Sequence, residues 1–518
     1  MGLVVRACSR IWWRVILVSF LSASTVLVGQ SSPSRFVGEV RTSPDHLTLG
    51  RQLGAEGKWK EAEKELRIYR NQHPDSLTAI VLHAESLIRI DQPFDAALEL
   101  QKFLQSHPDA VRAHELYAVL AAGTLKDQIL AASELEKCVK LAPKDFQAWK
   151  SLGDTYLDQE KSEEAIRAYQ RASQLQPADA VTAASLAHAY DQGGIPAKAA
   201  AEFDRALKLV RSGGREAAKD SASVQYLYGQ YLLNQGRSEQ SVVAMSKALK
   251  FNPNSPTALY WRARAYEKMK DYKNAENDAL QAIRLAPHSK EAPLLLINIY
   301  RKQENAAKVQ EYADMAQKLS DEEQTQASFG RSLRDALDRA EPLLREGRFA
   351  DATAQYEALI KLLPTFYEAY FDLGMCYGET GRPAEAEAAF RKYLSFQPVS
   401  ADGHGALGVL LLQQGRNQEA VSELEQAMQI DPTLDEARKA LASEYLHESN
   451  PNESIRVLRA AKDTKDPQLI VMLASILLDK GDTTGAQREF RRAQAIQPDD
   501  PDVLKLKQRL LSKSSTAK

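Results

Sequence analysis

Residues 146 to 179 show an alternation of apolar and polar positions that the rest of the chain repeats. The apolar positions of a first helix lie on one face of that helix: Trp149, Leu152, Gly153 and Tyr156. After a polar turn, those of a second helix do the same: Ala165, Tyr169 and Ala172. Pro177 ends the second helix, because proline lacks the amide that a continuing helix needs. Two helices of this length cannot bury their apolar faces alone, so similar pairs are expected on both sides.

Prolines mark the further copies of this helix pair. They stand at positions 74, 108, 143, 177, 253, 287, 364, 398, 432 and 498, and most intervals between them are 34 or 35 residues. The three longer intervals each leave room for a helix pair without a closing proline. The spacing therefore predicts about thirteen repeats.

The repeated residues resemble the tetratricopeptide repeat, whose pattern they match position by position: Trp149, Leu152, Gly153, Tyr156, Ala165, Tyr169, Ala172 and Pro177. The resemblance covers residues 43 to 500. It implies an all-α fold, a right-handed superhelical solenoid of about thirteen helix-turn-helix repeats with a C-terminal capping helix. It also implies a protein that binds proteins or peptides in a concave groove and is not an enzyme.

The phase of the repeats divides the chain into segments. We expect a signal peptide or N-terminal membrane anchor at 1–30, a linker at 31–42, eight repeats at 43–320 with an insertion at 211–221, a polar linker at 321–332, five repeats at 333–500, a capping helix at 501–513 and a tail at 514–518.

The first 30 residues have the pattern of an export signal. Arg6, Arg10 and Arg14 precede the apolar run from Val15 to Val28, and no acidic residue lies among them. This run is shorter than the about 20 residues of a membrane-spanning helix. The pattern predicts an extracytoplasmic protein, periplasmic or anchored in the membrane and facing the periplasm. Whether the segment is cleaved or retained as an anchor stays open.

Composition and motifs argue against several other kinds of function. The net charge is −2, which gives no reason to expect nucleic acid as the partner. Cys138 and Cys376 lie seven repeats apart, so we expect two buried thiols and no disulfide. The sequence contains no phosphate-binding glycine loop, no CxxC and no HExxH, and no metal or cofactor is expected. The repeats leave too few residues for a catalytic domain.

Two surfaces are candidate binding sites for partners. In proteins that the chain resembles, positions 2, 5, 9, 12 and 13 of each repeat line the concave groove. In repeats five to eight these positions predict a polar, locally basic groove that includes Tyr226, Gln230, Asn234, Tyr260, Arg264, Lys268, Asn298, Arg301 and Lys302. An arginine such as Arg264 can bind a carboxylate through two hydrogen bonds. The alternative is an ordinary solvated helix face, with Glu267 and Glu291 balancing its charge.

In repeats nine to thirteen the same positions are mostly apolar, and they include Phe371, Met375, Val409, Leu412, Leu446 and Leu478. They either form a trough for a partner helix or hydrophobic peptide, or they complete the core.

These features together favour a non-enzymatic scaffold of the cell envelope that binds proteins or peptides. The chain resembles envelope-associated repeat proteins of bacteria. An accessory subunit of an envelope assembly, secretion or polysaccharide or pilus export machine is the alternative, and an enzyme with an unrecognised site is a weaker one. A membrane contact is expected only through the N-terminal segment, if it is uncleaved.

Overall fold

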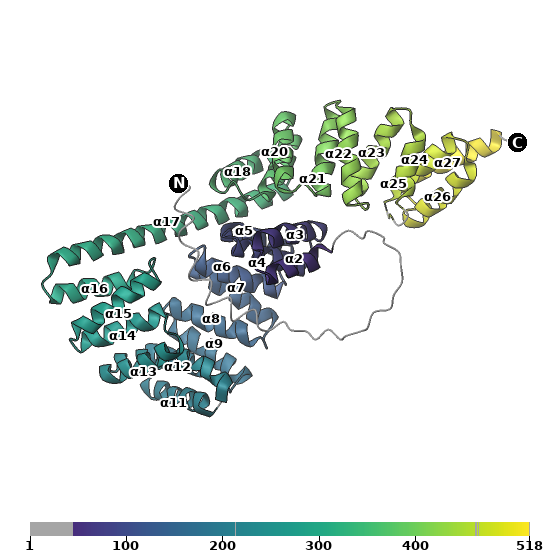
Figure 1. Ribbon diagram of the computed structural model, residues 1–518. Coiled ribbons are helices and arrows are strands. Elements are labelled where there is room, and N and C mark those ends of the chain that lie inside the picture. Colours follow the sequence, from purple (N-terminus) through teal and green to yellow (C-terminus); the bar gives the residue numbers. More distant parts are fainter. Residues whose placement is uncertain (1–44, 213, 462–463, 465, 517–518) are drawn as a thin grey trace. The chain divides into compact units, whose positions relative to one another are not determined.

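The computed structural model describes residues 45–516, except residues 213, 462, 463 and 465 (Figure 1). The predicted leader at 1–30 and linker at 31–42 lie outside this part. Within it the chain is all-α, as predicted, with 26 helices. The first fifteen are α2 (His46–Ala55), α3 (Trp59–Gln72), α4 (Leu77–Arg89), α5 (Pro93–Ser106), α6 (Val111–Gly123), α7 (Gln128–Leu141), α8 (Phe146–Asp158), α9 (Ser162–Leu175), α10 (Ala180–Gln192), α11 (Pro196–Ser212), α12 (Gly214–Asn234), α13 (Ser238–Phe251), α14 (Pro256–Lys268), α15 (Tyr272–Leu285) and α16 (Glu291–Lys302). The others are α17 (Ala306–Arg345), α18 (Phe349–Leu362), α19 (Glu368–Glu379), α20 (Pro383–Phe396), α21 (Ala401–Gln413), α22 (Asn417–Ile430), α23 (Asp435–His447), α24 (Pro451–Arg459), α25 (Pro467–Asp479), α26 (Thr483–Ile496) and α27 (Pro501–Thr516).

A tight turn joins the two helices of each repeat, and one residue of this turn has a positive φ. Over the described residues the positive-φ positions are thirteen: Gly57, Asp91, Lys126, Glu160, Gly194, Gly236, Lys270, Glu304, Gly347, Gly381, Gly415, Ser449 and Gly481. In twelve of these turns the next amide donates to a carbonyl five residues earlier, as from Lys161 N to Tyr156 O at 2.8 Å. This is the Schellman arrangement that ends a helix. The thirteen turns confirm the thirteen repeats predicted from the proline spacing.

Small residues lie where the two helices of a repeat cross. A Cβ added at Gly153 in α8 would lie 2.7 Å from Cε1 of Tyr169 in α9, which is fully buried. Ala165 at the same crossing is also fully buried. Carbon atoms in contact prefer about 3.5–4.0 Å, so no side chain fits at Gly153 without displacing a helix. The close approach predicted from the sequence is therefore present.

A side chain near the start of the first helix ties a repeat to the preceding one in five places. Each donates a hydrogen bond to the carbonyl of the closing proline six residues earlier, just beyond the end of the preceding helix. The donors are Trp149 to Pro143 (3.1 Å), His114 to Pro108 (3.0 Å), Tyr370 to Pro364 (3.3 Å), His404 to Pro398 (3.2 Å) and Arg438 to Pro432. The closing prolines thus end one helix and provide an acceptor for the next repeat.

The helices form two compact units. Unit 1 contains residues 80–332, and unit 2 contains residues 45–79 together with the described residues from 333 onward. The boundary at 332 falls inside helix α17.

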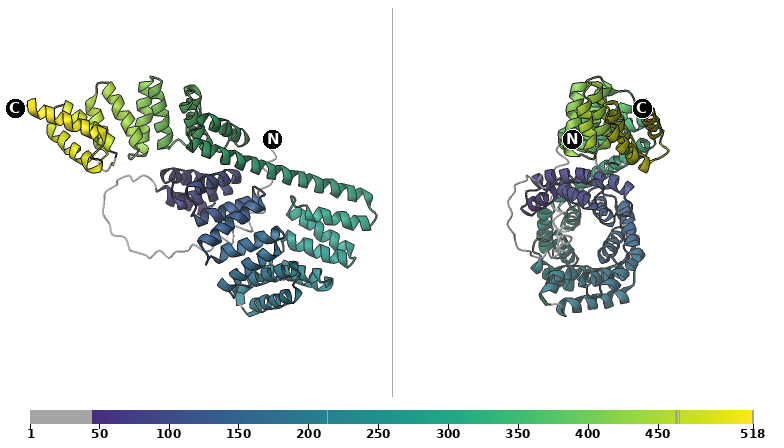
Figure 2. Two further views of the ribbon diagram at one scale, coloured as in Figure 1. Left: turned by 180° about the vertical axis from the view of Figure 1, so that it is seen from behind. Right: turned by 90° about the vertical axis from the view of Figure 1, so that its right-hand side faces the viewer.

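Unit 1 is closed by contacts between its last and its first residues (Figure 2). In α17, Gln326 Nε2 donates to the carbonyl of Thr124 at 3.2 Å. The ring of Phe329 meets that of Phe94 edge-on, with centroids 5.0 Å apart. A Cβ added at Gly330 would lie 3.0 Å from Cα of Leu125. These contacts span more than 200 residues of sequence and do not follow from packing between neighbouring repeats.

Unit 2 includes the first repeat of the chain, formed by α2 and α3. Arg70 near the end of α3 forms an ion pair with Glu368 at the start of α19. The neighbouring Asn71 donates from Nδ2 to Oε1 of Gln397 at 2.6 Å. Repeat one therefore packs against repeat ten, nine repeats further along the chain.

Two segments that the sequence marked as interruptions are helical. Residues 321–332, predicted to be a polar linker, lie within α17. The predicted insertion at 211–221 extends α11 and α12 on either side of residue 213, which is not described. Their composition explains this, because the only glycine of 321–332 is Gly330 and most of the other residues tolerate a helix well. The predicted cap at 501–513 is helix α27, which continues to Thr516.

Candidate functional site

The first helices of the repeats lie on the inner side of each unit. In unit 1, α8, α10, α12, α14 and α16 contact one another in succession, and in unit 2 α19, α21 and α23 do the same. No comparably extensive contact joins consecutive second helices in the part of the chain that the structure describes. Helices on the inside of a curve approach each other more closely, so residues at the predicted groove positions face inward.

The predicted basic groove of unit 1 contains residues that bond to one another. Gln230 is buried, 5% exposed, and donates to the Tyr226 hydroxyl at 2.9 Å. Burial raises the pKa of Tyr226 to about 12. Asn234 donates to Asp191 at 2.9 Å. These three predicted residues therefore hold the inner face together, and Gln230 is too buried for a partner to reach it.

A cation stacked on aromatic rings lies one repeat further on. The guanidinium of Arg264 is 4.4 Å from the ring centroid of Trp261 and 5.9 Å from that of Tyr260. The two rings meet edge-on at 5.6 Å. Such stacking holds the arginine in one orientation. Trp261 is outside the groove positions, so the sequence reasoning missed it, although an aromatic residue three positions before an arginine is a signal for this arrangement.

The remaining predicted residues of the basic groove are accessible. Lys268, Asn298 and Arg301 are exposed on α14 and α16. Lys302 forms an ion pair with Glu267 of the preceding repeat. Leu294, which the prediction did not include, is 47% exposed on α16. An accessible basic surface with one apolar side chain is thus present at repeats seven and eight.

Acidic side chains occupy the inner face of repeat four, which the sequence reasoning also missed. Asp154 accepts a hydrogen bond from the Tyr169 hydroxyl at 2.5 Å. Its side chain is exposed, yet the surrounding protein desolvates it and raises its pKa to about 6. Desolvation raises the pKa of Asp158, one turn further on, as well. Because unit 1 is closed, its inward-facing side chains reach water and are still surrounded by protein.

The predicted apolar trough of unit 2 is only partly accessible. Leu478 is fully buried, and Val409, Leu412 and Leu446 are half-buried against the core around it. Phe371 lies between the rings of Phe390 and Tyr393, at 5.7 and 5.2 Å. Met375 is 40% exposed. The placement of Leu478 in an accessible trough is corrected, since this side chain belongs to a core cluster that also includes residues of α26 and α27. That the other residues bind a partner stays a prediction.

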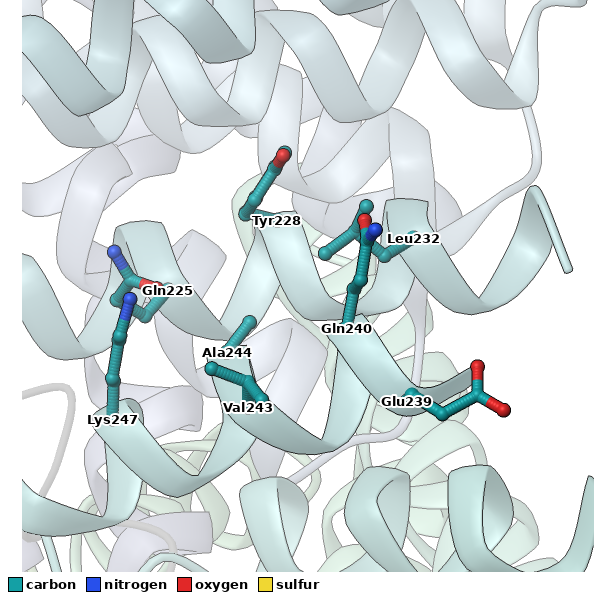
Figure 3. A pocket seen from close by; sticks show the side chains of 8 residues that line it. All are labelled: Gln225, Tyr228, Leu232, Glu239, Gln240, Val243, Ala244 and Lys247. Atoms are coloured by element: carbon teal, nitrogen blue, oxygen red, sulfur yellow. The ribbon is translucent and has the colours of Figure 1, made fainter. Parts of the chain in front are cut away.

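Two depressions lie at the surface of the described residues. One of about 260 Å³ lies between α12 and α13, where Figure 3 shows Gln225 and Lys247 at one end and Glu239 at the other. The second, of about 470 Å³, lies between α23, α25 and α27 at the C-terminal end of unit 2. Both are shallow and open to solvent.

The described residues hold neither a metal cluster nor a membrane-spanning helix. No group of three or more histidine, cysteine and acidic side chains is placed to bind a metal there. None of the described helices combines the length and the apolar character needed to cross a membrane.

Cys138 and Cys376 are free, buried thiols, as predicted, and burial raises their pKa values to about 12 and about 11.

Paired helices and thirteen similar turns define a helical repeat scaffold. Tetratricopeptide repeat profiles match residues 130–180, 151–221, 184–256, 226–290, 337–401, 381–435 and, with a second profile, 445–510. These segments cover more than half of the chain, which therefore belongs to the tetratricopeptide repeat family. The matched profiles describe repeats and no catalytic domain, and the family assignment supports a scaffold that binds proteins.

Known proteins are similar to this chain at low identity. Anaphase-promoting complex subunit 3 of Schizosaccharomyces pombe is 23% identical over 253 residues, which are 48% of this chain and 36% of that protein. The crystal structure of the APC/C hetero-tetramer Cut9-Hcn1 covers 91% of this chain and 97% of that chain, with 12% identity and a TM-score of 0.34. The crystal structure of MamA protein covers 32% of this chain and 90% of that chain, with 19% identity and a TM-score of 0.30.

Proposed function

We propose that the protein is a non-enzymatic scaffold of the cell envelope that binds an acidic segment of another protein on the inner face of unit 1. The accessible side chains Lys268, Asn298 and Arg301 carry this proposal. They project from consecutive first helices beside Arg264, which Trp261 holds in place. Accessible cations such as Lys268 and Arg301 attract an anionic partner and orient it.

The exposed Leu294 indicates more than electrostatic attraction. It lies on α16 one helical turn before Asn298 and is 47% exposed. A partner with an apolar residue beside its acidic residues would bury this side chain, and the hydrophobic effect would contribute about 25 cal/mol per Å² of apolar surface removed from water. Asp154 and Asp158 on the same inner face disfavour an acidic segment at repeat four, so the segment is expected at repeats seven and eight.

The proposal is tested by photo-crosslinking in cells that produce the full chain. A photoreactive residue replaces Asn298 on the inner face or, as the control, Lys273, which is exposed on the second helix α15. We expect a discrete adduct from position 298 alone. Lys268→Glu together with Arg301→Glu should abolish it, and Lys250→Glu together with Lys270→Glu, equal in charge but outside the inner face, should leave it unchanged.

Equal adducts from both positions, or an adduct that survives the reversal of the inner charges, would exclude this surface as the binding site.

The envelope location rests on the arginine-flanked apolar run at 1–30 and has its own test. Residues 1–45 fused to a reporter that works only outside the cytoplasm should give activity. An inactive fusion would return the protein to the cytoplasm without affecting the binding proposal.

A further inference from the structure

His114, near the start of α6, has a hydrogen-bond acceptor at each of its two ring nitrogens. Its Nε2 lies 3.0 Å from the carbonyl oxygen of Pro108, and its Nδ1 lies 2.5 Å from Oε2 of Glu134 in α7. Neither a carbonyl nor an ionised carboxylate can donate a hydrogen bond, and a neutral imidazole carries only one N–H. Both hydrogen bonds therefore exist together only while the ring carries two protons.

His404, near the start of α21, repeats this geometry in unit 2. Its Nε2 lies 3.2 Å from the carbonyl oxygen of Pro398, and its Nδ1 lies 2.6 Å from Oε2 of Glu423 in α22. Both histidines are buried. At the equivalent joints Trp149 and Tyr370 bond to the closing proline through an N–H or O–H that stays protonated at neutral pH. Only the histidine joints among these four require an added proton.

The charged groups around His114 favour the doubly protonated ring. Burial alone would raise the pKa of Glu134, but hydrogen bonds from His114 and Lys137 lower it below its usual value, so the carboxyl group is ionised. The further charged or titratable groups at this joint are Arg112 and Glu115 of α6, Cys138 of α7 and Asp145 before α8. Three carboxylates stand against two cations here, and the surplus negative charge stabilises a cationic ring.

The surroundings of His404 have the same sign of charge. Glu423 faces the ring, and Asp402 on the same helix interacts with Asp431 after α22. Tyr393 of α20 stays neutral, because burial raises its pKa to about 12. The negative charge at this joint therefore also stabilises a cationic ring.

We propose that the joints between repeats two and three and between repeats ten and eleven are proton-dependent, firm while His114 and His404 carry two protons and weakened when one proton leaves. In both cases the contact of Nδ1 with the carboxylate is the shorter one, and it is the charge-assisted one. A ring with a single proton therefore keeps that proton on Nδ1. Its Nε2 then turns a lone pair towards the proline carbonyl, so the hydrogen bond between the repeats is lost. The joints are firmest in acid and weaken as the pH rises.

In unit 1 the weakened joint holds the helix that takes part in closing the unit. Helix α6 runs from this joint to Gly123, and the next residues, Thr124 and Leu125, are the ones that α17 contacts. A change at His114 therefore reaches the closure through a single helix of 13 residues. This inference does not depend on the acidic partner proposed above, because it concerns the joints between repeats and none of the groove side chains.

The test compares joints that differ in their donor within one protein. Hydrogen exchange of the full chain is followed by mass spectrometry between about pH 5 and about pH 9, a range that spans the ordinary titration of histidine. The exchange rate in α6 is divided by that in α8, which has the Trp149 joint, and the rate in α21 by that in α19, which has the Tyr370 joint. Each ratio cancels the intrinsic effect of pH on exchange. We expect both ratios to rise about five-fold towards high pH, the effect of losing one hydrogen bond.

Glu134→Gln and Glu423→Gln should each abolish the rise at their own joint. A carboxamide can donate an N–H to Nδ1, so a neutral ring can keep its proton on Nε2 and its bond to the proline at every pH. Glu419→Gln is the matched control, because it makes the same change in α22 at a residue that pairs with Arg416 instead. It should leave the rise at the His404 joint unchanged.

Nuclear magnetic resonance of the natural chain with ¹⁵N-labelled histidine counts the ring protons directly and needs no variant to fold. At about pH 5 both nitrogens of His114 and His404 should be protonated, and at high pH Nδ1 alone should be. The two glutamine variants identify the signals, because each shifts one ring. A single ring proton at about pH 5, exchange ratios that do not change with pH in the natural chain, or a rise that persists in Glu423→Gln would overturn the proposal.

Discussion

The crossing of α19 and α20 offers a test of the packing with an internal control. A Cβ added at Gly374 would lie 2.7 Å from both Cδ1 and Cε1 of Phe390, and that ring is 2% exposed and packs against Phe371. A Cβ added at Gly378, one helical turn further along α19, would meet nothing within 4 Å. Gly374→Ala and Gly378→Ala therefore make the same chemical change in the same helix in two different environments.

The expected effects have opposite signs. Alanine is favoured over glycine in a helix by about 1 kcal/mol, so Gly378→Ala should stabilise the chain by up to that amount. At Gly374 the same gain is opposed by overpacking, which costs about 1–3 kcal/mol. The propensity contributions cancel in the comparison, and the difference between the two variants measures the steric cost alone, about 1–3 kcal/mol in favour of Gly378→Ala.

Urea unfolding followed by circular dichroism gives the two stabilities. Because a repeat array does not unfold strictly in two states, amide hydrogen exchange in α19 and α20 should accompany it and show faster exchange in Gly374→Ala only. If both variants stabilise the chain equally, the helices do not approach at Gly374 as described. Gly153→Leu, against the ring of Tyr169, should be more destabilising than either alanine variant.

Three further predictions concern single side chains. The folded-state pKa of Asp154 is raised to about 6, so its contribution to stability is fully present below about pH 3.8 and is lost as the pH rises through 6. Asp154→Asn should therefore raise the melting temperature at pH 7, and this gain should vanish near pH 3.5. A gain in melting temperature that does not depend on pH would contradict the desolvation of Asp154. Lys270 has a φ of 62°, a conformation that is strained for residues with a side chain, so Lys270→Gly should raise the melting temperature. A clear decrease in the melting temperature would show that the strain is absent. Phe371→Glu should destabilise unit 2, because the Phe371 ring packs against two other rings. Met375→Glu, at an exposed position, should leave the melting temperature nearly unchanged. An equal decrease in melting temperature for both variants would place both residues in the core.

The repeats could be predicted from the sequence because they depend on local rules. A proline every 34 or 35 residues ends a helix wherever it occurs, and a glycine such as Gly153 opposite Tyr169 defines a crossing within a single repeat. The thirteen turns followed from this periodicity even where Glu160 or Lys270 replaces glycine. The assignment of inward-facing positions was also local, and two of the residues at these positions, Lys268 and Arg301, are exposed.

The contacts between distant repeats could not be predicted in this way. The packing of Phe329 on Phe94 and the ion pair of Arg70 with Glu368 join residues more than 200 positions apart, and a periodic pattern contains no information about such pairs. For the same reason the sequence could not show that Gln230 and Leu478 are buried. Their exposure depends on the curvature of the helices around them, which accumulates over many repeats.

The thirteen positive-φ turns also bear on how such a chain tolerates change over evolutionary time. Six of them carry a residue other than glycine, and each such position is under local strain that a single substitution to glycine would relieve. The turns connect the helices and include none of the groove positions that face inward. Mutations there can raise or lower stability in small independent steps while the binding surfaces stay the same. A lineage can therefore offset a destabilising change at an inner face by a compensating one at any of several equivalent turns.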